Sequence, residues 1–342
     1  MIFMSGRERI SLVPNELEPT TGNAPERLES APLAYENAAF LDSPDGRWLR
    51  ILAEYSEPMA RFRRERIQDT VVFFGSARFH ALDAANHELE LLDNSYAAKS
   101  APAAEQPATE HELESGDTTE LKRDRAEAAV EMARYYEDAR KLARMVTEWA
   151  KGLPGRRHRF VVTSGGGPGI MEAANRGAWE AGGKTIGLNI KLPFEQYPNP
   201  YITPELNFNF HYFFMRKYWF AYLAKALVVF PGGFGTLDEM FELLTLDQTH
   251  KLAKKITIII YGSSYWKKVI NMDMLVEKGA ISPKDLDLFQ FADTPEDAFR
   301  ILKEGLTKYH LDGVVADQVG TVPNEPAPSA EELLGPGIAR TR

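Results

Sequence analysis

The sequence predicts an α/β fold, a doubly wound and mostly parallel sheet with helices on both faces. Apolar runs that resemble strands alternate with helical patterns from residue 70 to about residue 310. The runs, such as Thr70–Phe74 and Ile256–Ile260, are continuous rather than alternating, which is typical of parallel strands covered on both sides. Glycine-rich loops follow three of the strands, at the sheet edge where ligands bind in such folds.

The N-terminal part of the chain contains a predicted arm, a helix, a strand and an insertion. Residues 1–33 are rich in Pro, Glu, Asn and Thr without a period, which predicts a disordered arm. A helix is expected from Asp42–Asp45, and Pro58 is expected to kink or end it. After the strand Thr70–Phe74, residues 81–116 are dominated by Ala, Glu, Pro and Ser and predict a flexible insertion.

The rest of the chain continues the alternation in a single domain, predicted to cover residues 34–322 before a loose tail at 323–342. Asp117 and Glu120 form a possible capping box for a long helix that reaches about Ala150. The other expected strands are Arg159–Thr163, Lys184–Ile190, Leu206–His211, Ala226–Phe230, Ile256–Ile260 and Phe289–Phe291. The other expected helices are Ile170–Glu180, Phe213–Ala226, Met240–Thr249, Tyr265–Lys278 and one that begins at Thr294.

Composition excludes several classes of function. The chain has 342 residues, a formal net charge of −9 and no cysteine. The charge argues against nucleic-acid binding through bulk positive charge. Without cysteine there are no disulfides, thiolate metal sites or cysteine nucleophiles, and a cytoplasmic location is expected. No apolar run is long enough to span a membrane, and no signal-peptide core is visible at the N-terminus.

The segment Pro231–Glu239 predicts an anion site. It lies between an apolar strand and a helical pattern, so the backbone amides and the positive end of the helix dipole meet there. Ser164–Gly169 and Gly75–Arg78 are two further loops at the same sheet edge, and all three are expected to face one cleft. The chain has no G-x-x-x-x-G-K-[ST] motif, and Ile170 stands where a dinucleotide fingerprint needs its last glycine.

Two groups of charged residues accompany the anion site. Thr236 and Glu239 have the spacing of a capping box, so a purely structural role for them stays open. Asp238 is a second candidate acid. Arg216 and Lys217 lie in an otherwise aromatic and apolar helix, where a desolvated guanidinium needs an anion such as a ligand phosphate or Glu239. His211 and His250 show no metal-binding spacing, and no metal site is expected.

The motifs resemble those of the LOG (Lonely Guy) family, long labelled possible lysine decarboxylases. The resemblance rests on Gly75-Ser76, Ser164–Glu172, Met215-Arg216-Lys217 and Pro231–Glu239, which occur in the family's order. Here the arginine follows the methionine directly, a small departure from M-x-x-R-K. Lysine decarboxylation itself needs a pyridoxal phosphate lysine, and nothing in the sequence singles one out.

The resemblance implies hydrolysis of the N-glycosidic bond of nucleoside 5′-monophosphates, including cytokinin ribotides, to free base and ribose 5-phosphate. It implies that Arg216 and Glu239 are the catalytic pair and that the reaction needs no cofactor. It further implies that the small-molecule nucleotide is the partner, without nucleic acid or membrane, and that the chain forms a homodimer or higher homo-oligomer. The residues expected to bind the nucleotide are Gly75, Ser76, Arg78, Gly165, Gly166, Gly167, Glu172, Glu205, Lys217, Gly232, Gly233, Gly235, Thr236 and Asp238.

The chain departs from the family pattern at two points, and one alternative function stays open. Arg78 stands where short family members tend to carry glycine, so base recognition can differ. The chain is also longer than minimal members. A protein that binds a nucleotide or another phosphorylated ligand without turning it over is the alternative.

Overall fold

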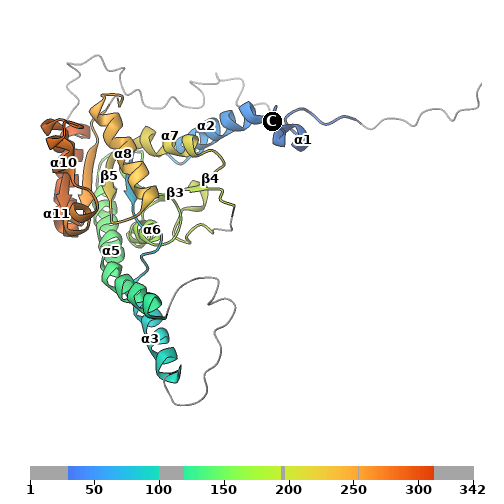
Figure 1. Ribbon diagram of the computed structural model, residues 1–342. Helices are drawn as coiled ribbons and strands as arrows, with labels where there is room; N and C mark the ends of the chain where they lie inside the picture. The colour runs from blue at the N-terminus through green and yellow to red at the C-terminus, as the bar shows by residue number, and fades with distance from the viewer. Residues whose placement is uncertain (1–29, 100–118, 194–196, 253, 312–342) are drawn as a thin grey trace, which may run out of the picture. The chain divides into compact units, whose positions relative to one another are not determined.

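Seven parallel strands form one sheet in the computed structural model, which describes residues 30–99, 119–193, 197–252 and 254–311 (Figure 1). The strand order is β4-β3-β2-β1-β5-β6-β7. The chain therefore winds outward from β1 in one direction and then, from β5, in the other. The predicted doubly wound parallel sheet is confirmed. The strands are β1 (Thr70–Phe74), β2 (Val161–Ser164), β3 (Thr185–Ile190), β4 (Asn207–Phe210), β5 (Ala224–Val229), β6 (Thr257–Tyr261) and β7 (Phe289–Ala292).

Helices fill the connections between the strands. The helices are α1 (Ala38–Asp42), α2 (Arg47–Arg64), α3 (Leu82–Lys99), α5 (Thr119–Lys151), α6 (Ile170–Glu180), α7 (Phe213–Leu223), α8 (Phe234–Gln248), α9 (Ser263–Val269), α10 (Met272–Glu277) and α11 (Pro295–His310). Two short 3-10 helices are η1 (Pro204–Leu206) and η2 (Pro283–Leu288). The chain divides into two compact units between Arg47 and Trp48, and the second contains the whole sheet. The predicted domain began earlier, at residue 34.

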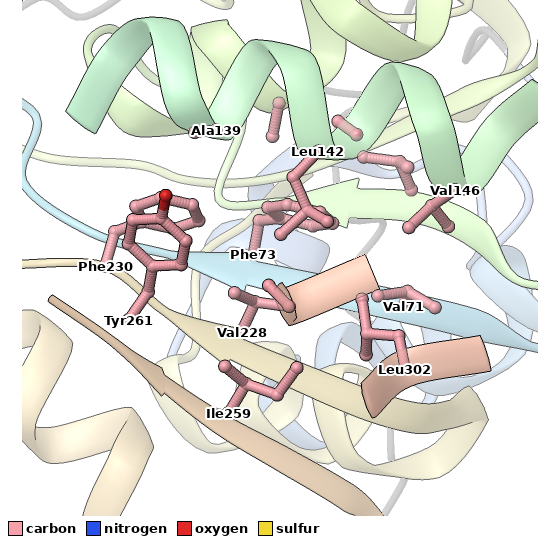
Figure 2. Packing of buried hydrophobic residues seen from close by; sticks show 14 of the residues in the cluster. Val71, Phe73, Ala139, Leu142, Val146, Val228, Phe230, Ile259, Tyr261 and Leu302 are labelled. Carbon is pink, nitrogen blue, oxygen red and sulfur yellow. The ribbon is translucent and has the colours of Figure 1, made fainter. Parts of the chain in front are cut away.

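Side chains of successive strand residues point to opposite faces of the sheet, and each face has its own core. On one face, Val71 and Phe73 of β1 pack with residues of α5, α6 and α11. Figure 2 shows this packing around Leu142 and Leu302. On the other face, Val72 and Phe74 pack with residues of α2, α7, α8 and α9. The continuous apolar runs of the sequence are thus explained by burial on both sides.

Several element boundaries differ from the sequence prediction for local reasons. β2 begins at Val161, not Arg159, because Phe160 has a φ of 53° and donates its amide to the Asp69 carboxylate. α7 ends at Leu223 because Ala224 already pairs with β1. Asn271 caps α10 by accepting a hydrogen bond from the Met274 amide, so the single helix expected there is two. Pro58 lies inside α2 and does not end it.

The expectation of a flexible insertion at 81–116 is wrong for its first half. Residues Leu82–Lys99 form α3, which packs beside the start of α5 (Figure 1). Alanine, leucine and glutamate are strong helix formers, and this composition outweighs the lack of a clear apolar stripe. The rest of the insertion, Asp117 of the expected capping box, and the terminal segments 1–29 and 312–342 lie outside the described residues.

Candidate active site

The strand order reverses between β1 and β5, and the candidate site lies where both strands end. The loop after β1 contacts the loops after the two neighbouring strands. The Ser76 amide donates to the Pro231 carbonyl at 3.0 Å, and the Ser76 carbonyl accepts the Ile170 amide at 3.0 Å. Gly75 packs against the Ile170 side chain. The structure therefore brings the three glycine loops together at one edge, as expected.

The loop Ser164–Gly169 is held from behind by two buried asparagines that sequence reasoning missed. Asn199 donates to the carbonyls of Gly166 and Gly167, both at 3.1 Å. Asn175 on α6 accepts from the Ser164 hydroxyl at 2.7 Å and from Asn199 at 2.9 Å. The sequence offered one signal for this role, because Asn175 is a polar residue among the buried apolar positions of α6. These bonds leave the Gly165 side of the loop as the part that meets the catalytic candidates.

The helix after the third loop begins earlier than the pattern suggested, and this removes the capping-box interpretation. α8 starts at Phe234 with Gly233 as its N-cap, and no side chain caps it. Glu239 lies in the second helical turn rather than the first, so its carboxylate cannot close a box on the N-cap amide. The first amides of a helix have no intrahelical acceptor. The uncapped start of α8 is consistent with an anion site.

Neither packing nor backbone conformation requires glycine at two positions near the start of α8. Added Cβ atoms on Gly233 and Gly235 would meet nothing within 4 Å, and neither residue has a positive φ. Gly232 is different, because its Cβ would collide with the Thr236 hydroxyl, and its carbonyl accepts the Tyr265 hydroxyl at 3.0 Å. The space at Gly233 and Gly235 fits a ligand that lies against the backbone.

Glu239 and Arg216 are two desolvated groups of opposite charge at this edge, and each affects the pKa of the other without an ion-pair contact among the described residues. Glu239 is only 5% exposed, and burial raises the pKa of its carboxyl to about 7 although the charges of Lys217 and Arg216 oppose this. Burial also lowers the pKa of the Arg216 guanidinium, against the effects of Glu239 and Asp238. Its Nε is buried and has no hydrogen-bond partner among the described residues. A Cβ on Gly165 would lie 3.5 Å from Arg216 Nη2.

This pair can do two things chemically. A desolvated guanidinium without an anion in contact is costly, and a ligand phosphate or carboxylate bound to its other nitrogens would supply the missing counter-charge. A carboxyl group with a pKa near neutrality can stabilise a cation or exchange a proton at the pH of a cell.

Lys217, unlike Arg216, contacts carboxylates of α8. Its Nζ lies 2.6 Å from Glu242 Oε2, 2.9 Å from Asp238 Oδ2 and 3.6 Å from Glu239 Oε2. Burial lowers the pKa of Lys217, but its bonds to Asp238 and Glu242 outweigh this and the pKa is raised. Beside these residues, a cavity of about 660 Å³ lies along α8. Its lining consists of Lys217, Phe234, Leu237, Asp238, Phe241, Glu242, Thr245 and Leu246.

The remaining predicted contacts divide between the two edges of the sheet. Arg78 is exposed on the loop after β1. Glu172 lies in the first turn of α6 and accepts the Tyr136 hydroxyl at 2.8 Å. Glu205 lies in η1, which precedes β4 at the amino edge of the parallel sheet, away from the glycine loops, so its role as a substrate contact stays a prediction that the structure does not support. The loop before η1 starts near the glycine loops and crosses to that opposite edge, which the sequence did not reveal.

The described part of the chain shows neither a metal-binding cluster nor a membrane-spanning helix. Residues 30–99, 119–193, 197–252 and 254–311 contain no group of three or more His, Cys, Asp or Glu arranged to hold a metal ion. In the same ranges, none of the helices has the length and apolarity needed to cross a membrane.

Comparisons with known proteins agree with the motifs. A family model described as "Possible lysine decarboxylase" matches residues 171–302. The chain is 27% identical over 176 residues to the Oryza sativa subsp. japonica protein named "Cytokinin riboside 5'-monophosphate phosphoribohydrolase LOG", covering 51% of this chain and 70% of that protein. It is also 27% identical over 150 residues to the Arabidopsis thaliana protein of the same activity named LOG3, covering 43% of this chain and 68% of that protein.

A solved structure of a Moco carrier protein from Chlamydomonas reinhardtii matches 51% of this chain and 89% of that chain. Its identity is 22% and its TM-score 0.35, too low to support an argument about function. The sequence matches confirm the resemblance to the LOG family.

Proposed function

We propose, from this relation to the LOG family, that the chain hydrolyses the N-glycosidic bond of nucleoside 5′-monophosphates. Water attacks C1′, the C1′–N bond breaks, and the products are the free base and ribose 5-phosphate. The observation that supports this best is that the Glu239 carboxyl and the Arg216 guanidinium are both desolvated and each affects the pKa of the other, while the buried Nε of Arg216 has no partner among the described residues. The Glu239 carboxylate can stabilise a cation that develops at C1′, and the Arg216 guanidinium can bind the phosphate anion.

The mechanism follows from these two groups. Breaking a ribosyl C–N bond passes through an oxocarbenium-like state. The Glu239 carboxylate stabilises that cation or takes a proton from the attacking water. Arg216 and the uncapped start of α8 bind the 5′-phosphate, which holds C1′ near Glu239. The low exposure of Glu239 strengthens its electrostatic effect on the transition state.

The experiment that tests the function measures free base released from AMP, GMP, CMP and isopentenyladenosine 5′-monophosphate, with adenosine as the control that lacks a phosphate. We expect base release from at least one nucleotide and a rate on adenosine at least about 10²-fold lower, since the phosphate interactions position the sugar. Binding of the nucleotides without release would support the alternative of a non-catalytic binding protein. Equal rates on AMP and adenosine would reject the phosphate site.

Gly235 offers a test of the phosphate site that separates binding from stability. It occupies a helical position with open space around its Cα, so alanine there should stabilise the fold by up to about 1 kcal/mol. The added methyl group would also stand where the phosphate approaches the backbone. We expect Gly235→Ala to raise the Tm slightly and to raise the KM for AMP several-fold. A higher Tm with unchanged KM would show that the phosphate binds elsewhere.

The homo-oligomer stays a prediction from the resemblance, and the cytoplasmic location stays a prediction from the absence of cysteine. Sedimentation velocity and subcellular fractionation would test them.

A further inference from the structure

Lys217 is surrounded by carboxylates of a single helix face. On α8, Asp238 and Glu242 are i,i+4 neighbours and Glu239 and Glu242 are i,i+3 neighbours, and all three approach the same ammonium group. An ammonium group has three N–H donors, and three carboxylates lie within 3.6 Å of this one. The side chain of Lys217 is 18% exposed and that of Glu242 is 31% exposed. The contacts are therefore partly shielded from solvent.

Lys217 and Arg216 are adjacent in sequence, but only Lys217 has carboxylate partners in the described part of the chain. Arg216 has a buried Nε without a hydrogen-bond partner among the described residues. Lys217 has two carboxylates at hydrogen-bond distance and a third close by. Turning Lys217 toward a substrate phosphate would break these contacts and leave the carboxylates of α8 without their cation. Arg216 can bind a phosphate without any such loss.

We propose that Lys217 is a positioning residue that holds the Glu239 carboxylate, with Asp238 and Glu242 as its anchors, and that it does not bind the substrate phosphate. Its kinetic consequences rest on the proposed function, whereas its effect on the ionisation of Glu239 does not. The charged groups that act on Glu239 are Lys217 and Arg216 from α7, which favour the carboxylate, and Glu242 and Asp238 from α8, which oppose it.

The first experiment titrates Glu239 without substrate, following its carboxyl carbon by NMR in protein with labelled glutamate and assigning the signal with Glu239→Gln. We expect Lys217→Met to move the midpoint to higher pH and Glu242→Gln to move it to lower pH. Lys303→Met, which removes an exposed lysine of α11, is the matched control and should move nothing. An unchanged midpoint in both site variants would overturn the proposal whether or not the protein is an enzyme. Glu242→Gln keeps the test available if Lys217→Met does not fold.

The second experiment measures the kinetics of Lys217→Met. A unit charge 3.6 Å away changes an ionisation constant roughly sevenfold even in the dielectric of water. With a pKa of about 7 in the wild type, the carboxylate fraction of Glu239 at pH 7 then falls about fourfold. We expect kcat to fall by about this factor at pH 7, to recover above about pH 8.5, and to be restored by Lys217→Arg.

The Michaelis constant separates this role from phosphate binding. We expect the KM for AMP and the preference for AMP over adenosine to stay within about twofold of the wild type. A KM raised tenfold or more, with the preference lost, would assign Lys217 to the phosphate and overturn the proposal. If no base is released from any nucleotide, the proposed function fails, and the titration still decides the role of Lys217.

Discussion

Base release from AMP should fall by about 10²- to 10⁴-fold when Glu239 is replaced by glutamine, the range expected for loss of a positioned acid–base or electrostatic group. Glutamine keeps the shape of the buried side chain but cannot carry the negative charge that the oxocarbenium-like state requires. The measurement is the chromatographic assay of free adenine at saturating AMP. Asp238→Asn serves as the comparison, because Asp238 is the neighbouring acid and its side chain is 59% exposed.

The pH dependence of the rate is a second test of the catalytic role of Glu239. With a pKa of about 7, Glu239 becomes a carboxylate as the pH rises through neutrality, so the wild-type rate should rise over the same range. Near-wild-type turnover in Glu239→Gln, or a rate that is flat between about pH 6 and 8, would contradict the assignment. A larger loss in Asp238→Asn would transfer the role to that residue.

The stability of the Glu239→Gln variant should move in the opposite direction to its activity. The folded pKa of about 7 lies above the ordinary value of 4.5. The stability contributed by this group is therefore fully present below about pH 4.5 and is lost as the pH rises through about 7. Glutamine does not titrate, so the Tm of the variant should exceed that of the wild type by a margin that grows toward pH 8.

Arg216→Met should lower kcat/KM for AMP by about 10²- to 10³-fold, the effect of removing a preorganised charge from a water-excluded site. Methionine retains apolar contact with the rings of Phe213 and Phe220, over which the guanidinium lies. Arg216→Lys should recover only part of the loss, because an ammonium cannot bind a phosphate through two parallel hydrogen bonds. Steady-state kinetics on AMP and adenosine measure both effects.

The Tm of Arg216→Met distinguishes a ligand-binding arginine from a structural one. Breaking a buried ion pair costs about 3–5 kcal/mol. Here no carboxylate lies within 4 Å of the guanidinium among the described residues, and its Nε is unpaired. We therefore expect an unchanged or higher Tm. A Tm lower by several degrees, with an unchanged KM for AMP, would show that Arg216 serves the fold.

The sequence predicted the order and type of nearly all strands because burial on both faces leaves long apolar runs that tolerate little variation. It also predicted that the loops after β1, β2 and β5 meet, because the carboxyl ends of parallel strands share one edge. Boundaries were less accurate where one side chain decides them. The positive φ of Phe160 and the cap provided by Asn271 are examples.

The site was harder to predict than the fold because it depends on side-chain direction and on the path of loops. Thr236 and Glu239 have capping-box spacing, but such a box requires Thr236 to be the N-cap. The N-cap of α8 is Gly233, so both residues lie inside the helix. Glu205 lies in η1, after a loop that crosses from one sheet edge to the other, and the amino-acid composition of that loop does not reveal the crossing. Lys217 carries the same charge as Arg216, and only its contacts with α8 separate their roles.

Arg216, Lys217 and Glu239 all belong to the continuous run α7–β5–α8, with β5 next to the centre of the sheet. These three charged side chains thus come from one continuous stretch of the polypeptide. Insertions and deletions elsewhere, such as the segment around α3, can accumulate without shifting these groups relative to one another. Relatives that differ in length elsewhere should therefore keep the spacing from Arg216 to Glu239 constant.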